Sequence, residues 1–238
     1  MTLGHLTRVA VDTVRISAPT IVEGALGRLS VEVCDERLDW WSTRVLARAR
    51  VHMTAEGLEN APRDEAFVVM SNHQSLYDIP VLFQALKRRV RMVAKTELFK
   101  VPLWGHAMRV AGFVEVDRHN RSKAIASLRA AQAELERGTS IWIAPEGTRS
   151  ESGKLQPFKK GGFHLALEAG ARILPVTIVG TRDALLARGF RVKNGAVVQV
   201  FIHPPVDPQA FGKERREDLI GVVRAAIGSR LPYGRDGS

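Results

Sequence analysis

The chain has little of what disulfide-stabilised proteins and metalloproteins use. Cys34 is the single cysteine among 238 residues, so neither an intrachain disulfide nor a cluster of thiolates around a metal can form. The seven histidines are scattered, and none forms the HExxH pair or a similar spacing of metal ligands. We therefore expect a protein of a reducing compartment with no bound metal and no bound cofactor.

Long apolar runs are also missing. No stretch of about 18 apolar residues occurs, which is what a transmembrane helix needs. Arg8, Asp12 and Arg15 stand where a signal peptide would have its apolar region. The spacings of a P-loop and of a dinucleotide-binding loop are absent, which counts against such nucleotides as ligands. We expect a cytoplasmic protein whose membrane contact is peripheral, at the cytoplasmic face.

Positive charge, in contrast, is abundant. Thirty-five Lys and Arg against 25 Asp and Glu give a formal net charge of +10 and a pI of about 10.3. This charge favours an anionic partner, such as nucleic acid, an anionic membrane surface or a phosphorylated substrate. Aromatic residues make up 6% of the chain and do not interleave with basic ones, so we expect no nucleic acid. A basic, non-enzymatic peripheral membrane-binding protein is the alternative.

Residues 1–60 are expected to form a helical segment that contacts the membrane. The first 30 or so fit a weak amphipathic helix interrupted at Pro19. A second helix follows from Asp35, and Trp40 and Trp41 stand near its start. Paired tryptophans on a basic helix suit the headgroup boundary of an anionic membrane, but an ordinary helix packed on a domain has the same pattern. The apolar face of this second helix comprises Leu38, Trp41, Val45 and Leu46.

Residues 61–238 are expected to form an α/β domain. Apolar runs and amphipathic stretches alternate after the polar connection 56–64. For helix 121–137, Asn120 is the expected N-cap and Gly138 the expected end. The pattern indicates a mainly parallel central sheet flanked by helices. The predicted strands are 66–71, 91–95, 113–117, 140–144, 173–178 and 196–203, and the predicted helices are 77–87, 103–111, 121–137, 160–169 and about 211–230.

The segment 69–78, Val-Met-Ser-Asn-His-Gln-Ser-Leu-Tyr-Asp, is the best candidate for a catalytic loop. It begins as a buried strand and ends in a polar loop, and active sites of open α/β sheets lie at that end of a strand. His73 beside a carboxylate can take a proton from a hydroxyl, while Asp78 fixes the ring tautomer. Ser75 is not expected to be a nucleophile, because no G-x-S-x-G elbow surrounds it; it is expected to be a polar residue at a helix entry.

Further loops carry groups that suit a phosphate. Arginine holds phosphate bidentately, and glycine lets a backbone approach a ligand closely. The ordinary alternatives are solvated surface cations and a turn closed by an internal ion pair. The candidates are Lys95 at the end of strand 91–95, Arg118 after strand 113–117, Glu146, Gly147, Thr148 and Arg149 in the loop after strand 140–144, and the helix start Lys159–Gly162.

Four blocks in order resemble the glycerolipid acyltransferase family. The first, an HxxxxD motif in the form NHQSxxD, is similar to the 1-acyl-sn-glycerol-3-phosphate acyltransferases, also called lysophosphatidate acyltransferases. Glu115 departs from the family, which often has an apolar or aromatic residue there, and this leaves substrate detail open. The blocks lie within residues 66–182 and comprise Asn72 to Asp78, Gly112 to Arg118, Pro145 to Ser150, and Ile173 to Val176.

The resemblance implies an O-acyltransferase of phospholipid biosynthesis. It would move a fatty acyl group from acyl-CoA or acyl-ACP to the free hydroxyl of a lysophospholipid, with 1-acyl-sn-glycerol-3-phosphate as the expected acceptor and phosphatidate as the product. Another lyso-lipid, such as lyso-ornithine lipid, is the alternative acceptor. Acyl carrier protein and an anionic membrane surface are the implied partners. The implied roles are general base for His73, orientation of its ring for Asp78, and acceptor binding for Lys95, Arg118, Glu146, Gly147, Thr148 and Arg149.

Overall fold

A single central sheet carries the fold of the computed structural model, which describes residues 2–117, 121–189 and 191–232. Within these ranges seven strands pair in the order β1-β7-β6-β2-β5-β3-β4. Neighbouring strands run parallel except β6 and β7, which are antiparallel. The strands are β1 (His52–Glu56), β2 (Val68–Ser71), β3 (Val90–Lys95), β4 (Val114–Val116), β5 (Ser140–Ile143), β6 (Ile173–Val179) and β7 (Val197–Ile202). The predicted mainly parallel sheet is confirmed.

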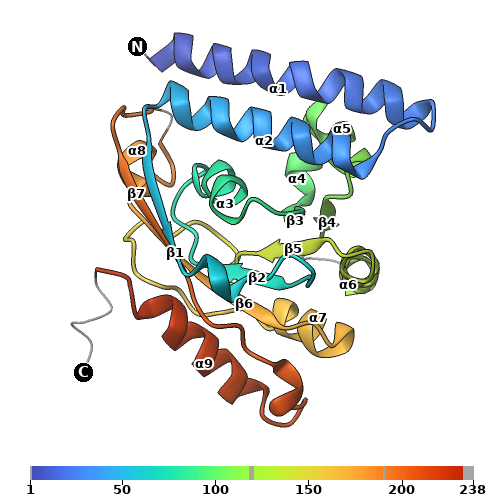
Figure 1. The fold of residues 1–238 in the computed structure, drawn as a ribbon, viewed down its shortest axis with the longest axis vertical. Helices are drawn as coiled ribbons and strands as arrows, with labels where there is room; N and C mark the ends of the chain where they lie inside the picture. The colour runs from blue at the N-terminus through green and yellow to red at the C-terminus, as the bar shows by residue number, and fades with distance from the viewer. Residues whose placement is uncertain (1, 118–120, 190, 233–238) are drawn as a thin grey trace.

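Helices cover both faces of this sheet (Figure 1). On one face α3 packs under α2, and on the other lie α6, α7 and α9. The central strands β2 and β6 are therefore buried on both faces, which explains why they read as continuous apolar runs. The helices are α1 (Thr2–Ala25), α2 (Val31–Arg48), α3 (Asp78–Leu86), α4 (Thr96–Phe99), α5 (Trp104–Val110), α6 (Arg121–Glu136), α7 (Gly161–Ala169), α8 (Thr181–Ala184) and α9 (Arg216–Gly228).

The helices and strands predicted after residue 61 are present, with their ends shifted by a few residues. Gly138 ends α6 as predicted, with a φ of 80° and its N–H bonded to the carbonyl of Leu135. The predicted cap Asn120 lies outside the described residues. The last helix begins at Arg216 and not near 211, because Pro208–Ala210 first makes a 3-10 turn.

Two expectations about the first 60 residues were wrong. Pro19 does not interrupt α1, which continues to Ala25. Proline removes one backbone hydrogen bond, but α1 packs along α2 and α5, and this packing holds the helix together. Residues His52–Glu56 are not helical either; they form β1, an edge strand paired with β7. Its short pattern of alternating exposed and half-buried residues gave little signal in the sequence.

The two tryptophans of α2 contact side chains of α1 and do not project into solvent. The indole N–H of Trp41 donates to Thr13 Oγ1 at 3.0 Å, and the ring packs against the main core. The guanidinium groups of Arg15 and Arg44 lie 5.4 and 4.8 Å from the ring centre of Trp40. The ordinary alternative, a helix packed on the domain, therefore describes α2.

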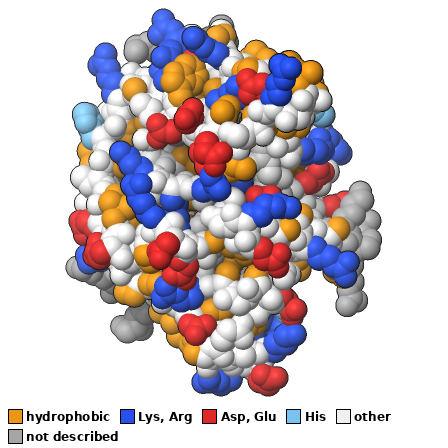
Figure 2. All heavy atoms as spheres, turned by 45° about the vertical axis from the view of Figure 1, so that its right-hand side comes forward, with side chains coloured by type: hydrophobic (Ala, Val, Ile, Leu, Met, Phe, Trp, Pro, Cys, Tyr) orange, Lys and Arg blue, Asp and Glu red, His pale blue; other side chains and the backbone are white. Residues whose placement is uncertain are grey.

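Exposed apolar side chains lie on α1 instead. Val11, Val14 and Val22 are 49 to 59% exposed, and their spacing places them on one side of this helix. Leu26, directly after the helix ends, is 58% exposed. Figure 2 shows hydrophobic and basic side chains next to one another at the top of the molecule, where α1 and α2 lie. None of the helices in the described ranges combines the length and the apolar character that crossing a membrane requires.

Candidate active site

His73 and Asp78 meet at the carboxyl end of β2. His73 lies in the loop after this strand, and Asp78 is the first residue of α3. The ring nitrogen Nδ1 of His73 lies 2.7 Å from Asp78 Oδ2, and the side chain of Asp78 is fully buried. Because an ionised carboxylate only accepts hydrogen bonds, Nδ1 carries the proton and donates it to Asp78 in a hydrogen bond, and the other nitrogen, Nε2, has no proton in the neutral ring.

The oxygen Asp78 Oδ2 also fixes the loop itself. It accepts the backbone N–H groups of Gln74 at 2.7 Å and Ser75 at 2.9 Å, in addition to the bond with His73. The five-residue spacing of the motif allows this, because the chain turns back on the carboxylate before α3 begins. Side chain and loop backbone are thus bonded to one buried atom, which places the His73 ring within a narrow range of orientations.

Two polar side chains of the same motif tie the loop to distant parts of the chain. Asn72 exchanges two hydrogen bonds of 2.8 Å with the backbone of Ile178 in β6. Ser75 is fully buried, and its hydroxyl donates to the carbonyl of Leu185 at 2.7 Å. Ser75 therefore has a structural position and is not available to attack a substrate, as the missing elbow motif predicts.

Glu146 holds His73 from the opposite side. One carboxylate oxygen accepts the backbone N–H of His73 and the other accepts that of Gln156, both at 2.8 Å. Burial raises the pKa of Glu146, and the two backbone hydrogen bonds counteract part of this rise. Since both oxygens are engaged within the protein, Glu146 supports the loop that carries His73 and has no oxygen left for a ligand.

A cavity of about 400 Å³ opens beside His73. Lys95, Gly147, Thr148 and Arg149, four of the predicted acceptor-binding residues, line it together with His73. Gly147 adopts a φ of 78°, a left-handed conformation that favours glycine and turns the chain beneath the cavity. In the ranges the structure describes, no carboxylate pairs with Arg149 or Lys95, so both cations are available to an anionic ligand. Arg118 lies outside the described residues.

Trp142 is part of the site, although no motif or spacing in the sequence points to it. The rings of Trp142 and His73 pack edge-on, with their centroids 5.8 Å apart. The indole N–H donates to Ser71 Oγ at 3.0 Å. It stands on β5, the strand next to β2, so only the sheet order reveals that it contacts the histidine.

A second, mostly apolar cavity of about 510 Å³ adjoins the first. The two share Val93, Ile143, Ala144 and Gly147, which form the wall between them. Side chains from α6 and α7, including Leu128, Ala131 and Leu165, line the far part. Within the described residues no group of three His, Cys, Asp or Glu side chains comes together as a metal site.

Comparisons with known proteins show the family of the chain. The family model described as Acyltransferase matches residues 52–179, more than half of the chain. The chain belongs to this family. The resemblance drawn from the four blocks is thereby confirmed, and the matched range contains the His73 loop and the Arg149 loop.

Several curated relatives of this chain bear the name 1-acyl-sn-glycerol-3-phosphate acyltransferase. This chain is 34% identical over 165 residues to the 1-acyl-sn-glycerol-3-phosphate acyltransferase of Salmonella typhimurium. The match covers 69% of this chain and 66% of that protein. To the mouse alpha form it is 32% identical over 74% of this chain and 62% of the relative. To the chloroplastic enzyme of Arabidopsis thaliana it is 37% identical, over 63% of this chain and 42% of the relative. The matched part thus spans 42 to 66% of these relatives.

A solved structure extends the likeness over nearly the whole chain. The crystal structure of the 1-acyl-sn-glycerophosphate acyltransferase PlsC from Thermotoga maritima superposes with a TM-score of 0.80 at 29% sequence identity. The superposition covers 97% of this chain and 94% of the other chain. The N-terminal helices and the edge strand β1 are therefore shared features of the two folds.

Glu146→Gln tests the supporting role of Glu146. Glutamine keeps the size but offers one acceptor oxygen, so one of the two backbone N–H groups faces an amide N–H and loses its partner. The unpaired donor costs about 1 to 3 kcal/mol, which corresponds to roughly a 5- to 150-fold loss of turnover if it displaces His73. Steady-state kinetics should show a lower kcat with little change in KM.

The matched control is Glu151→Gln, an exposed carboxylate near the same loop that pairs with Arg188 at the surface. It should leave kcat unchanged. A change in KM alone for Glu146→Gln would mean that the carboxylate contacts the acceptor and does not position His73.

Proposed function

We propose that this protein transfers a fatty acyl group from acyl-CoA or acyl-ACP to the free hydroxyl of 1-acyl-sn-glycerol-3-phosphate, giving phosphatidate in phospholipid biosynthesis. The observation that carries the proposal is the 2.7 Å contact between His73 Nδ1 and Asp78 at the edge of a cavity that Arg149 also lines. A base and a cation that can hold phosphate thus face the same space. The names of the relatives support the same acceptor.

The reaction needs no nucleophile from the protein. His73 Nε2 removes the proton from the acceptor hydroxyl while that oxygen attacks the thioester carbonyl. Asp78 stabilises the imidazolium that forms. The tetrahedral intermediate then expels the thiolate, which takes the proton back from His73. The ester bond replaces the thioester bond, the products are phosphatidate and a free thiol, and His73 returns to its starting state.

The charged part of the cavity fits the phosphate of the acceptor. Arg149 is half-buried and Lys95 exposed, and both line the space next to His73. A guanidinium can bind a phosphate through two parallel hydrogen bonds. We assign Arg149 and Lys95 to the phosphate, with Gly147 and Thr148 shaping the backbone around it and Glu146 acting through His73. Arg118 stays a candidate on the strength of its motif alone.

The apolar cavity fits an acyl chain. It adjoins the His73 cavity, and apolar residues of β3, β4, β5, α6 and α7 make up most of its wall. Transfer of an alkyl chain out of water into such a space is favourable by about 0.8 kcal/mol per methylene. A chain lying there would bring its carboxyl end to the wall shared by the two cavities, next to His73.

We also propose peripheral contact with the cytoplasmic face of an anionic membrane, through the segment 1–60. The exposed apolar side chains of α1 and the net charge of +10 support this placement. A lysophospholipid acceptor resides in the membrane, so such contact would present it to the cavity. Acyl carrier protein, an acidic protein donor, is a partner that the same basic surface would suit.

The direct test of the proposed function is acceptor-dependent release of free thiol. Purified protein is supplied with palmitoyl-CoA or palmitoyl-ACP, with and without 1-acylglycerol-3-phosphate. We expect thiol release that requires the acceptor. His73→Ala should lower turnover by about 100- to 10,000-fold, the usual contribution of general-base catalysis, while the variant stays folded.

His106→Ala is the matched control, because His106 is exposed on α5 and lines neither cavity. It should retain full turnover. Near-normal activity of His73→Ala would contradict the mechanism, and binding to anionic vesicles without any acyl transfer would favour the non-enzymatic alternative.

Arg149→Ala tests the phosphate site. Loss of a charge-assisted hydrogen bond costs about 1.5 to 3 kcal/mol, so kcat/KM for 1-acylglycerol-3-phosphate should fall roughly 10- to 100-fold. A neutral monoacyl acceptor should show little change. Arg129→Ala, which removes an exposed arginine of α6, is the control. Equal losses with both acceptors would remove Arg149 from the phosphate site and reopen the assignment to another lyso-lipid.

Leu128→Phe tests the acyl cavity. The larger ring occupies part of the space that Leu128 lines, so the preferred acyl donor should become shorter. Each displaced methylene removes about 0.8 kcal/mol, roughly a fourfold change in preference. Ile125→Phe makes a comparable change on the same helix at a position that is 47% exposed, and should leave the preference unaltered. Donors of graded length reveal both outcomes, and an unchanged profile for Leu128→Phe would place the chain elsewhere.

A further inference from the structure

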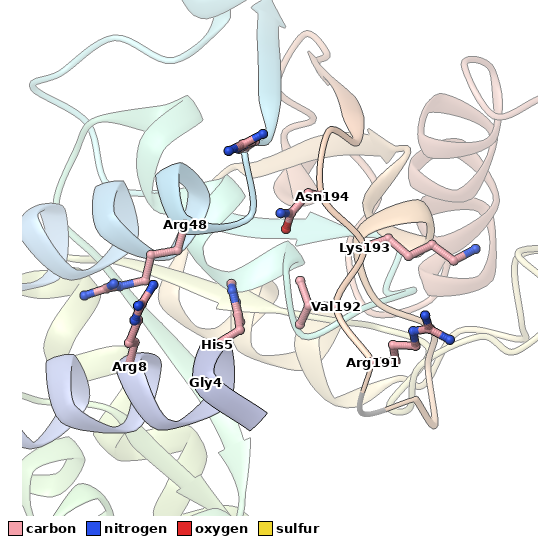
Figure 3. A pocket seen from close by; sticks show the side chains of 9 residues that line it. Gly4, His5, Arg8, Arg48, Arg191, Val192, Lys193 and Asn194 are labelled. Carbon is pink, nitrogen blue, oxygen red and sulfur yellow. The ribbon is translucent and has the colours of Figure 1, made fainter. Parts of the chain in front are cut away.

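A third cavity, of about 750 Å³, lies between the beginning of α1, the end of α2 and the loop 191–194 (Figure 3). No residue lining it also lines the cavity beside His73. Among the described residues that line it none is acidic, whereas five are Lys or Arg. The lining residues are Gly4, His5, Arg8, Arg48, Arg50, Arg191, Val192, Lys193 and Asn194.

The helix side of this cavity has more positive charge than the protein itself neutralises. The nearby carboxylate of Asp12 is already bonded to Arg48 at 2.7 Å and to Arg44 at 3.2 Å. Within the described part of the chain, Arg8 and Arg50 have no ion pair. Like charges gathered without counter-charge repel one another, and an anion bound among them would relieve that repulsion.

Figure 3 shows which of the lining side chains lie near the helices and which point away from them. His5 and Arg8 extend from α1 beside Arg48 of α2, and Asn194 points toward these helices from the loop across the cavity. Arg191 and Lys193 point away from the helices in this view. We therefore assign the charged face of the cavity to α1 and to the end of α2.

Arg50 has a backbone conformation that the fold alone would assign to glycine. After α2 ends, its N–H bonds to the carbonyl of Ala47, and the N–H of Val51 bonds to that of Leu46. This pair of bonds is a Schellman motif, in which the residue at the Arg50 position is left-handed and usually glycine. Arg50 has a φ of 48° there, which strains a residue with a side chain. The strain makes arginine less stable than glycine at this position, and a role in ligand binding would explain why arginine is present.

His5 connects the cavity to the catalytic segment. Its Nε2 lies 2.9 Å from the hydroxyl of Tyr77, the residue before Asp78. Burial lowers the pKa of His5, and the positive charges of Arg48 and Arg8 lower it further. Burial also raises the pKa of the Tyr77 hydroxyl, which keeps its proton. An anion entering the cavity would reverse the effect of the arginines on His5, so this ring can report that the cavity is occupied.

We propose that this cavity binds a phosphate monoester, held by Arg8, Arg48 and Arg50 with His5 as a further donor. Planar guanidinium groups suit the oxygens of phosphate, and a space of this size holds a phosphate together with a small group such as glycerol. The site is distinct from His73 and goes beyond the acyl transfer reaction. The ligand can be the headgroup of a membrane lipid or a soluble phosphate compound, since both present the same dianion.

The experiment follows the imidazole resonances of His5 by NMR. The protein carries Arg149→Ala, which weakens phosphate binding beside His73, and His5→Gln assigns the signals. One series receives inorganic phosphate or glycerol 3-phosphate, and the other receives short-chain phosphatidate in neutral micelles. The pKa of His5 should rise by about one pH unit on saturation, as expected for a nearby opposite charge.

Arg50→Gly separates binding from folding. It should weaken phosphate binding at least about 10-fold, since one charge-assisted contact is lost, while Tm stays the same or rises because glycine fits the left-handed position. Lys87→Gly is the matched control: Lys87 also has a left-handed backbone, with a φ of 45°, and does not line this cavity. It should relieve the same strain, remove the same charge and leave binding intact. Arg8→Gln, at an exposed position, is a second binding variant.

The two ligand series identify the source of the phosphate. Tighter binding of phosphatidate than of glycerol 3-phosphate would assign the site to a membrane lipid, and equal binding would assign it to soluble phosphates. An unchanged His5 in both series would overturn the proposal. Equal phosphate affinity of Arg50→Gly and Lys87→Gly would also overturn the proposal. If Arg50→Gly then lowered Tm as well, the role of Arg50 would be to stabilise the carboxyl end of α2.

Discussion

The buried carboxylate of Asp78 is the constraint on which the site depends. A fully buried charge is costly, and three hydrogen bonds to its single oxygen Oδ2 offset that cost. Two of these bonds come from the loop backbone and one from His73, so the contact that orients the ring also closes the loop. The other oxygen, Oδ1, is buried without a hydrogen-bond partner in the described part of the chain. The carboxylate is thus held in place for the histidine at some expense of stability.

The parallel sheet explains why His73 shares a cavity with the cations Arg149 and Lys95. β2, β5 and β3 are neighbours and run in the same direction, so the loops carrying His73, Arg149 and Lys95 emerge at one edge. Glu146, in the loop after β5, accepts a hydrogen bond from the backbone N–H of His73, in the loop after β2. This bond fixes the spacing of the two loops. The apolar cavity lies behind this edge between β4, β5, α6 and α7. In the proposed reaction the acyl chain and the polar headgroup would therefore lie on different sides of His73.

The sequence predicted the parts of this arrangement that depend on order along the chain. His73 and Asp78 are five residues apart, and their position after an apolar run was enough to place them. Contacts between distant segments could not be predicted in this way: Trp142 contacts His73 from the neighbouring strand β5, and Tyr77 contacts His5, which is 72 residues away in the chain. For Glu146 the loop was predicted but not the direction of its hydrogen bonds. Trp41 was misleading because an indole suits a membrane boundary and a helix interface equally well.

The central claim is that Asp78 holds His73 in the tautomer with its proton on Nδ1 and leaves Nε2 free to act as a base. Nitrogen-15 NMR of the imidazole at neutral pH tests this directly, because protonated and unprotonated ring nitrogens have distinct shifts. We expect a His73 ring with a protonated Nδ1, a downfield proton shared with Asp78, and an unprotonated Nε2, and we expect this pattern to be lost in Asp78→Asn. A His73 ring protonated on Nε2 in the unmodified protein would contradict the account.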